Sequence, residues 1–195
     1  NYAETEYRRF LFNFPDDYDA SMLLGKSLYS QKKYDEAASL YLRLLTKNKK
    51  DKILLTNAAF ALWKSGKDYK NILNRLKKTG KEGHYLALTS EGEMFIEEKK
   101  YSEAAEIIAQ AEQKFKFAEH DANLHMLKAK LAIYTNNIEE TKSMITYIEG
   151  HFPGNQDIPF LKKQLLSLEK AKAKAANTQK RKTKNLTSAA KKTKR

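Results

Sequence analysis

The chain has 195 residues, of which 41% are hydrophobic and 31% are charged, and its formal net charge is +13 at pH 7. This length is sufficient for a domain with a real core. The absence of cysteine excludes disulfides and thiolate metal sites, and no apolar run in the sequence is long enough to span a membrane.

The first predicted element is an amphipathic helix over residues 2–14. Its apolar residues Tyr7, Phe10 and Phe14 recur at helical spacing. Pro15 then stops the helix, because a proline cannot continue the hydrogen-bonded ladder. The chain therefore opens with one short helix that has an apolar side.

Four pairs of helices are predicted to follow, at about 18–51, 52–83, 84–118 and 121–154. In each pair, apolar side chains recur at helical spacing on both sides of a short polar turn. A last helix is predicted over residues 158–176, because leucines supply one apolar side while lysines cover the other. After Ala176 the apolar pattern fails, and disorder is expected for residues 177–195 because they cannot bury enough apolar surface to offset the entropy of ordering.

Two nearly identical stretches mark the turns of the first and third pairs. They read Lys-Lys-Tyr-Asp-Glu-Ala-Ala at 32–38 and Lys-Lys-Tyr-Ser-Glu-Ala-Ala at 99–105, and they lie 67 positions apart. This offset is close to twice a period of about 34 residues. A glycine precedes each stretch, Gly25 in one case and Gly92 in the other. Such small residues, with the alanines that follow the turns, let two antiparallel helices approach closely.

This pattern resembles that of the tetratricopeptide repeat (TPR) family, in which a large apolar residue, Leu-Gly, an aromatic, Gly-x-Tyr and Ala recur at fixed offsets. The resemblance covers most of the chain and implies an all-α fold, a right-handed superhelix of antiparallel helix pairs with a C-terminal capping helix. It divides the chain into a TPR array at 1–157, a capping helix at 158–176 and a basic tail at 177–195. The array would contain a partial repeat at 1–17 and then about four repeats.

The stretch 7–17 is similar to the second-helix ends of TPR proteins from the bacterial envelope. This similarity implies that Pro15 ends a repeat whose first helix lies upstream, so we expect the chain to be a fragment or a processed product. The bacterial periplasm and the cytoplasm are the compartments that fit this expectation.

No catalytic or metal-binding constellation is recognisable in the sequence. The four histidines are scattered, and no His-Glu-x-x-His run, phosphate-cradling Gly-rich loop or Gly-x-Ser-x-Gly turn occurs. Acid-rich stretches such as 91–98 are typical of solvated helix faces. We therefore predict a protein that is not an enzyme and that uses no cofactor and no metal.

In the TPR family, the first helices of the pairs line a concave face that binds extended peptides or helices of other proteins. When these positions are carried over, the resemblance predicts a partner-binding groove formed by Tyr29, Phe60, Trp63, Lys64, Ile96, Lys130, Ile133 and Tyr134. Exposed aromatic and apolar side chains of this kind are typical of interaction sites. The alternative for Trp63 and Tyr29 is that they fill space between adjacent repeats. The carboxylate clamp of some TPR proteins is not expected, because only Asn57 falls on one of its positions.

The positive charge is concentrated at the C-terminal end. Between Lys170 and Arg195 there are eleven lysines or arginines and no acid, so the rest of the chain carries a net charge of only +2. This tail is interpreted as a solvated end, as a nuclear-import signal around 180–182, or as a contact for nucleic acid, a membrane surface or an acidic partner. The residues of the predicted anionic-partner contact are Lys180, Arg181, Lys182, Lys184, Lys191, Lys192, Lys194 and Arg195.

Two functions are thus predicted. The first is a non-enzymatic scaffold or adaptor that binds a segment of another protein through the concave TPR face. The alternative is a component of a nucleic-acid-associated complex in which the basic tail contacts phosphate, and such binding would be sensitive to salt. The tail contains no aromatic residue on which bases could stack, which argues against sequence-specific recognition of RNA.

Overall fold

The computed structural model describes the backbone of residues 2–192 and the side chains of residues 2–180. Within this part the chain forms ten α-helices and one 3₁₀ helix, and no strand occurs among the described residues. The helices belong to two compact units, Asn1–Glu119 and His120–Arg195. The all-α prediction is therefore confirmed.

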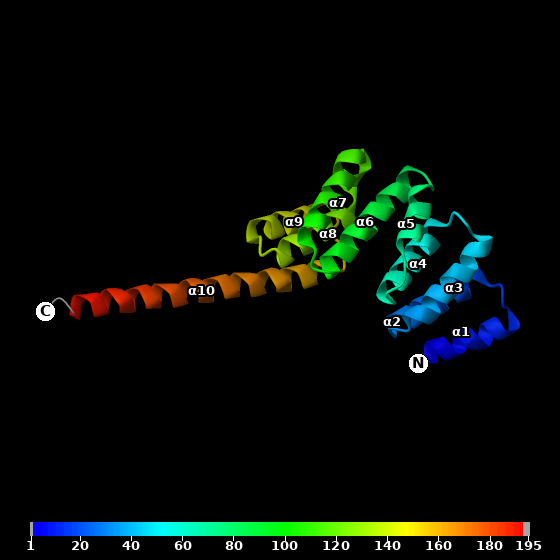
Figure 1. Cartoon of the computed structure of the whole chain (residues 1–195), viewed down its shortest axis with the longest axis horizontal. Coiled ribbons are helices and arrows are strands. Elements are labelled where there is room, and N and C mark those ends of the chain that lie inside the picture. The colour runs from blue at the N-terminus through cyan, green and yellow to red at the C-terminus, as the bar shows by residue number, and fades with distance from the viewer. Residues whose placement is uncertain (1, 193–195) are drawn as a thin grey trace. The chain divides into compact units, whose positions relative to one another are not determined.

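Unit 1 begins with a single helix, which three helix pairs follow. Successive helices pack against each other, so that each pair forms a hairpin (Figure 1). A 3₁₀ helix, η1 (Lys116–His120), lies at the end of the unit. The α-helices of unit 1 are α1 (Tyr2–Asn13), α2 (Tyr18–Ser30), α3 (Tyr34–Lys47), α4 (Lys52–Lys64), α5 (Lys70–Lys77), α6 (Lys81–Glu97) and α7 (Tyr101–Lys114).

Unit 2 consists of α8 (Ala122–Tyr134), α9 (Ile138–His151) and α10 (Ile158–Lys192). Its core includes Met126, Ile145 and Ile148 and the first turns of α10. Thr141 replaces the alanine expected at the start of the second helix. Its side chain is fully buried, and its hydroxyl donates a hydrogen bond of 2.7 Å to the carbonyl of Asn137 in the preceding turn. The buried hydroxyl is therefore satisfied.

Aspartates begin the first helix of several pairs. A carboxylate oxygen of Asp17 accepts a hydrogen bond from the amide of Ala20 at 2.7 Å, and Asp51, 34 positions later, accepts one from the amide of Leu54 at 2.9 Å. Asp121 caps α8 in the same way. Each carboxylate accepts hydrogen bonds from amides that have no partner inside the helix. The start of each of these helices is therefore determined by residues that are close in sequence.

The turns inside the four helix pairs share one backbone conformation. In each turn one residue has a positive φ, and these residues are Lys32 (62°), Gly66 (73°), Lys99 (61°) and Asn136 (57°). The amide of the next residue donates back to a carbonyl five positions earlier, which closes the end of the first helix. These hydrogen bonds join Lys33 to Leu28, Lys67 to Leu62, Lys100 to Phe95 and Asn137 to Ala132, at 2.8–2.9 Å. The first helix of every pair therefore ends with the same geometry, although the connection between α4 and α5 is longer than those of the other pairs.

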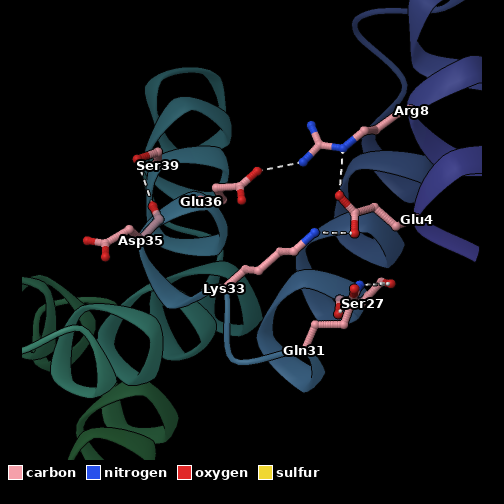
Figure 2. A network of polar contacts seen from close by, with 8 residues as sticks. All are labelled: Glu4, Arg8, Ser27, Gln31, Lys33, Asp35, Glu36 and Ser39. Atoms are coloured by element: carbon pink, nitrogen blue, oxygen red, sulfur yellow. Dashed lines mark hydrogen bonds and ion pairs between the residues drawn. The ribbon is translucent and has the colours of Figure 1, made fainter. Parts of the chain in front are cut away.

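A group of ion pairs fastens α1 to the first helix pair, as Figure 2 shows. The carboxylate of Glu4 lies 2.8 Å from the ammonium of Lys33 and 2.8 Å from the guanidinium of Arg8. Arg8 also lies 2.6 Å from the carboxylate of Glu36 on α3. The hydrogen bonds from Lys33 and then from Arg8 lower the pKa of Glu4 to about 2. Glu4 is thus a buried carboxylate that is fully paired.

The helix α10 continues past Ala176, where the sequence pattern places the end of the capping helix, and runs to Lys192. Its first part packs on α8 and α9, since Leu161 is fully buried and Leu165 and Leu168 are partly buried in the core of unit 2. The segment after Ala176, for which disorder is expected from the sequence, is therefore helical as far as Lys192. Alanine and lysine are good helix formers, which favours this continuation even without an apolar face. Residues 193–195 lie outside the described part.

Candidate binding site on the first helices of unit 1

An apolar hollow of the predicted groove lies in unit 1, between the first two helix pairs. It has a volume of about 280 Å³ and is lined by Lys26 and Tyr29 of α2, Tyr41 of α3, and Asn57 and Phe60 of α4. We call these five residues the aromatic pocket. Three aromatic rings and two polar groups thus surround one cavity.

The floor of the aromatic pocket depends on a glycine. A Cβ atom at Gly25 would lie 2.4 Å from Cε1 and 2.8 Å from the hydroxyl oxygen of Tyr41, so only glycine leaves room for this ring against α2. Tyr41 is 2% exposed, and burial raises the pKa of its hydroxyl to about 12. The sequence pattern places Gly25 at a close contact between helices, and the structure identifies Tyr41 as the side chain that fills the contact.

The polar groups of the aromatic pocket are hydrogen-bond donors that have no partner within the described chain. The side-chain nitrogen of Asn57 is buried and makes no hydrogen bond. Leaving a buried amide unpaired costs free energy, so an acceptor from a ligand would be favoured at this point. Lys26, at the edge of the pocket, is exposed and makes no ion pair among the described residues. The pocket therefore suits a ligand with an apolar part and an oxygen acceptor.

Tyr29 forms one wall of the aromatic pocket. Its ring meets the ring of Tyr34 edge to face, with 5.0 Å between the centroids. Burial and then the carboxylates of Glu97 and Glu93 raise the pKa of Tyr29 to about 12. Tyr29 is therefore an uncharged donor at any physiological pH, and acidic side chains of α6 lie on its side of the pocket.

Beside the pocket, Trp63 and Lys64 are held by acids at the end of α6. The indole nitrogen of Trp63 donates a hydrogen bond of 2.6 Å to Glu98, and its ring meets that of Phe60 edge to face at 6.2 Å. The ammonium of Lys64 lies 4.4 Å from the centroid of the Trp63 ring and pairs with Glu97. A hydrogen bond from Lys100 and then that from Trp63 lower the pKa of Glu98. Trp63 thus links two repeats, and its ring lies against Phe60, which lines the pocket.

Four residues of the predicted groove lie around this site in unit 1. Tyr29, Phe60, Trp63 and Lys64 line or border the aromatic pocket. Ile96 is only 3% exposed and Ile133 only 8% exposed, so the structure places both in the core instead of on a binding face. Three of the predicted groove residues belong to unit 2, namely Lys130, Ile133 and Tyr134.

In unit 2, Tyr134 ends α8 with an exposed ring and Lys130 is partly exposed. In the predicted tail contact, Lys180 is exposed. The side chains of Arg181, Lys182, Lys184, Lys191 and Lys192, and the whole of Lys194 and Arg195, lie outside the described residues.

Sequence reasoning missed Tyr41 and the acids that hold Trp63. Tyr41 lies on a second helix, and the family pattern assigns the groove to first helices only. The feature of the sequence that could have indicated Tyr41 is Gly25, sixteen positions earlier, because its lack of a side chain leaves space that the Tyr41 ring fills. The partners Glu97 and Glu98 lie about one repeat after Lys64 and Trp63, in a stretch that resembles a solvated face.

The described residues hold no group of three or more His, Asp and Glu side chains placed to bind a metal ion. In the same part of the chain, every helix is too short or too polar to cross a membrane.

Comparisons with known proteins agree with this fold. The family model described as "Tetratricopeptide repeat" matches residues 3–52, which hold α1 and the first helix pair. The crystal structure of a tetratricopeptide repeat protein from Parabacteroides merdae is similar over 89% of this chain and 68% of that chain, with a TM-score of 0.56 and 21% sequence identity. No curated protein matches the chain. The chain therefore contains a match to a tetratricopeptide repeat at residues 3–52, and its fold is that of a tetratricopeptide repeat protein.

Proposed function

We propose that this protein binds a segment of a partner protein at the aromatic pocket of unit 1 and thereby serves as a non-enzymatic scaffold or adaptor. TPR repeats generally mediate protein–protein interaction, and the family is typically non-enzymatic. The observation that carries the proposal is the buried, unpaired amide nitrogen of Asn57 in a cavity lined by three aromatic rings.

The chemistry of the pocket defines what the partner segment carries. An apolar side chain of the segment would fill the space between Tyr29, Tyr41 and Phe60. A main-chain carbonyl or a carboxylate beside it would accept hydrogen bonds from the amide of Asn57 and from the ammonium of Lys26. Aromatic anchors of this kind are each worth about 2 kcal/mol or more when they lie at the centre of a contact.

The experiment selects peptides from a random library displayed on phage, with the full chain as bait, and measures the affinity of each selected peptide by calorimetry. The variants Asn57→Ala and Phe60→Ala test the pocket, and Phe12→Ala, a highly exposed aromatic on α1, is the matched control. We expect each pocket variant to weaken binding at least about tenfold, because a hot-spot residue is lost. Selected peptides that bind the pocket variants as tightly as the parent would refute the proposal.

A second pair of variants locates the surface beyond the pocket. Trp63→Ala with Tyr134→Ala changes the predicted groove, while Phe10→Ser with Phe14→Ser changes the exposed aromatic side of α1. Both are first checked for an unchanged helical spectrum. Loss of peptide binding in the α1 variant alone would assign the partner to α1 instead. The alternative function, phosphate contact by the basic tail, involves unit 2 and is independent of this pocket.

A further inference from the structure

The charge and burial of α10 both change after Glu169, which is the last acidic residue of the chain. The carboxylate of Glu169 lies 2.9 Å from the ammonium of Lys142 on α9. Up to this point one side of α10 packs against the rest of unit 2, since Lys162 pairs with Glu149 of α9 and Leu161 is fully buried. The packed part of the helix therefore ends near the last carboxylate.

Beyond Glu169 no described side chain of α10 is buried. All residues from 170 to 180 are exposed, and alanine is the only apolar residue type among them, so this part of the helix has no stripe of large apolar side chains to bury. None of Lys170, Lys172, Lys174 and Lys180 makes an ion pair within the described part of the chain. Lys170 and Lys174 are one helical turn apart, where like charges repel. This part of the helix thus carries positive charge that the protein itself does not neutralise.

The sequence extends this charge to the end of the chain. Between Lys170 and Arg195 there are eleven lysines or arginines, no acid and no aromatic residue, and Leu186 is the single large apolar side chain. Because α10 runs from Ile158 to Lys192, its 35 residues give a helix about 50 Å long. Lys170, Lys172, Lys174 and Lys180, whose side chains are described, therefore lie along one helix.

We infer that α10 from Lys170 onward binds a linear polyanion, namely the phosphodiester backbone of a nucleic acid, without reading its sequence. Interfaces with nucleic acids are polar and strongly positive, and their affinity comes mainly from contacts of lysine and arginine with phosphate. The absence of aromatic side chains means that no base is stacked, so the contact is independent of sequence. Neutralisation of the repelling lysines would also stabilise the helix.

The composition of this segment disfavours two other anionic partners. A helix that lies on a membrane needs an apolar face that enters the lipid, and residues 170–180 present none. An acidic protein would bury an interface core enriched in apolar and aromatic residues, and the segment after Lys170 has almost none. Phosphate contact requires only the exposed cations that are present.

The experiment compares two variants of the full chain that lose the same number of charges. In the first, Lys170, Lys172, Lys174 and Lys180 are replaced by Gln, which keeps a similar helix propensity. In the matched control, Lys49, Lys50, Lys78 and Lys81 are replaced by Gln; these lysines are exposed in unit 1 and make no ion pair among the described residues. The probe is a fluorescein-labelled, mixed-sequence RNA duplex of about 25 base pairs, and anisotropy is measured over a range of salt concentrations.

At about 0.1 M salt we expect the α10 variant to bind the duplex at least about tenfold more weakly than the parent, with a shallower dependence of affinity on salt, because fewer counterions are released. The control is expected to stay within about twofold of the parent, since its charges are not on α10. An equal loss in both variants would overturn the proposal by showing that net charge alone attracts the probe. Absence of binding at low salt, or equally tight binding of poly-glutamate or of anionic phospholipid vesicles, would overturn it too.

Discussion

The ring of Tyr41 lies directly against the backbone of Gly25, in the space that any other side chain at position 25 would occupy. This contact joins α2 to α3 and also forms the floor of the aromatic pocket. The close approach of two helices and the presence of the cavity therefore have the same cause.

Replacement of Gly25 by alanine is expected to destabilise the protein. The new Cβ atom would lie 2.4 Å from the Tyr41 ring, which is itself enclosed and has little room to move. Overpacking of this kind costs about 1–3 kcal/mol. The measurement is urea unfolding followed by the fluorescence of Trp63, the single tryptophan, which reports on unit 1.

The control for this prediction is Gly150→Ala near the end of α9, where nothing lies within 4 Å of the new Cβ atom. Alanine is a better helix former, so this change is expected to stabilise the helix by about 0.5–1 kcal/mol as measured by circular dichroism. If both changes were to shift stability in the same direction, the contact with Tyr41 would not be the cause.

Replacement of Lys99 by glycine is expected to stabilise the protein. Lys99 adopts a φ of 61°, and its side chain is exposed. A left-handed conformation costs an L-residue about 1–2 kcal/mol, which exceeds the entropy cost of about 0.5–1 kcal/mol that glycine adds. Thermal unfolding should show a higher Tm. The reciprocal change, Gly66→Ala at a φ of 73°, should lower it, and a lower Tm for Lys99→Gly would refute the prediction.

Acid is expected to weaken the attachment of α1. Because ion pairs lower the pKa of Glu4 from 4.5 to about 2, its contribution to stability is complete above pH 4.5 and is lost as the pH falls through 2. The variant Glu4→Gln should therefore be less stable than the parent at pH 6, and the difference should shrink between pH 4.5 and pH 2.

The control for the acid effect is Glu6→Gln on the same helix, which removes a carboxylate that makes no ion pair within the described chain. Thermal unfolding of the three proteins at several pH values is the measurement. A gap between the parent and Glu4→Gln that is independent of pH would show that the carboxylate of Glu4 is not the titrating group.

Replacement of Glu98 by alanine is expected to release Trp63. The indole would lose its hydrogen bond of 2.6 Å, so its fluorescence should shift to the red and acrylamide should quench it more strongly. Glu106→Ala, an exposed acid on α7, is the control and should leave both properties unchanged. Unchanged fluorescence in Glu98→Ala would mean that Phe60 and Lys64 hold the indole without help from Glu98.

The helix pairs could be predicted from the sequence because their signals are local. Asp17 and Asp51 cap helices within three residues, and the turns at Lys32 and Lys99 are closed by hydrogen bonds that span five residues. Such interactions depend on neighbours in the chain, so a repeated sequence produces a repeated turn. The TPR-type fold could therefore be predicted before any contact between helices was known.

Only the tertiary structure decided which first-helix residues face the pocket and which are buried. Ile96 and Ile133 share their helical spacing with groove positions, but packing of neighbouring helices covers them. Contacts such as Glu4 with Lys33 and Trp63 with Glu98 join residues about 30 positions apart. Helical periodicity determines which residues share one face of a helix. Packing determines which neighbouring helices cover that face. The pocket and the attachment of α1 therefore could be identified only from the tertiary structure.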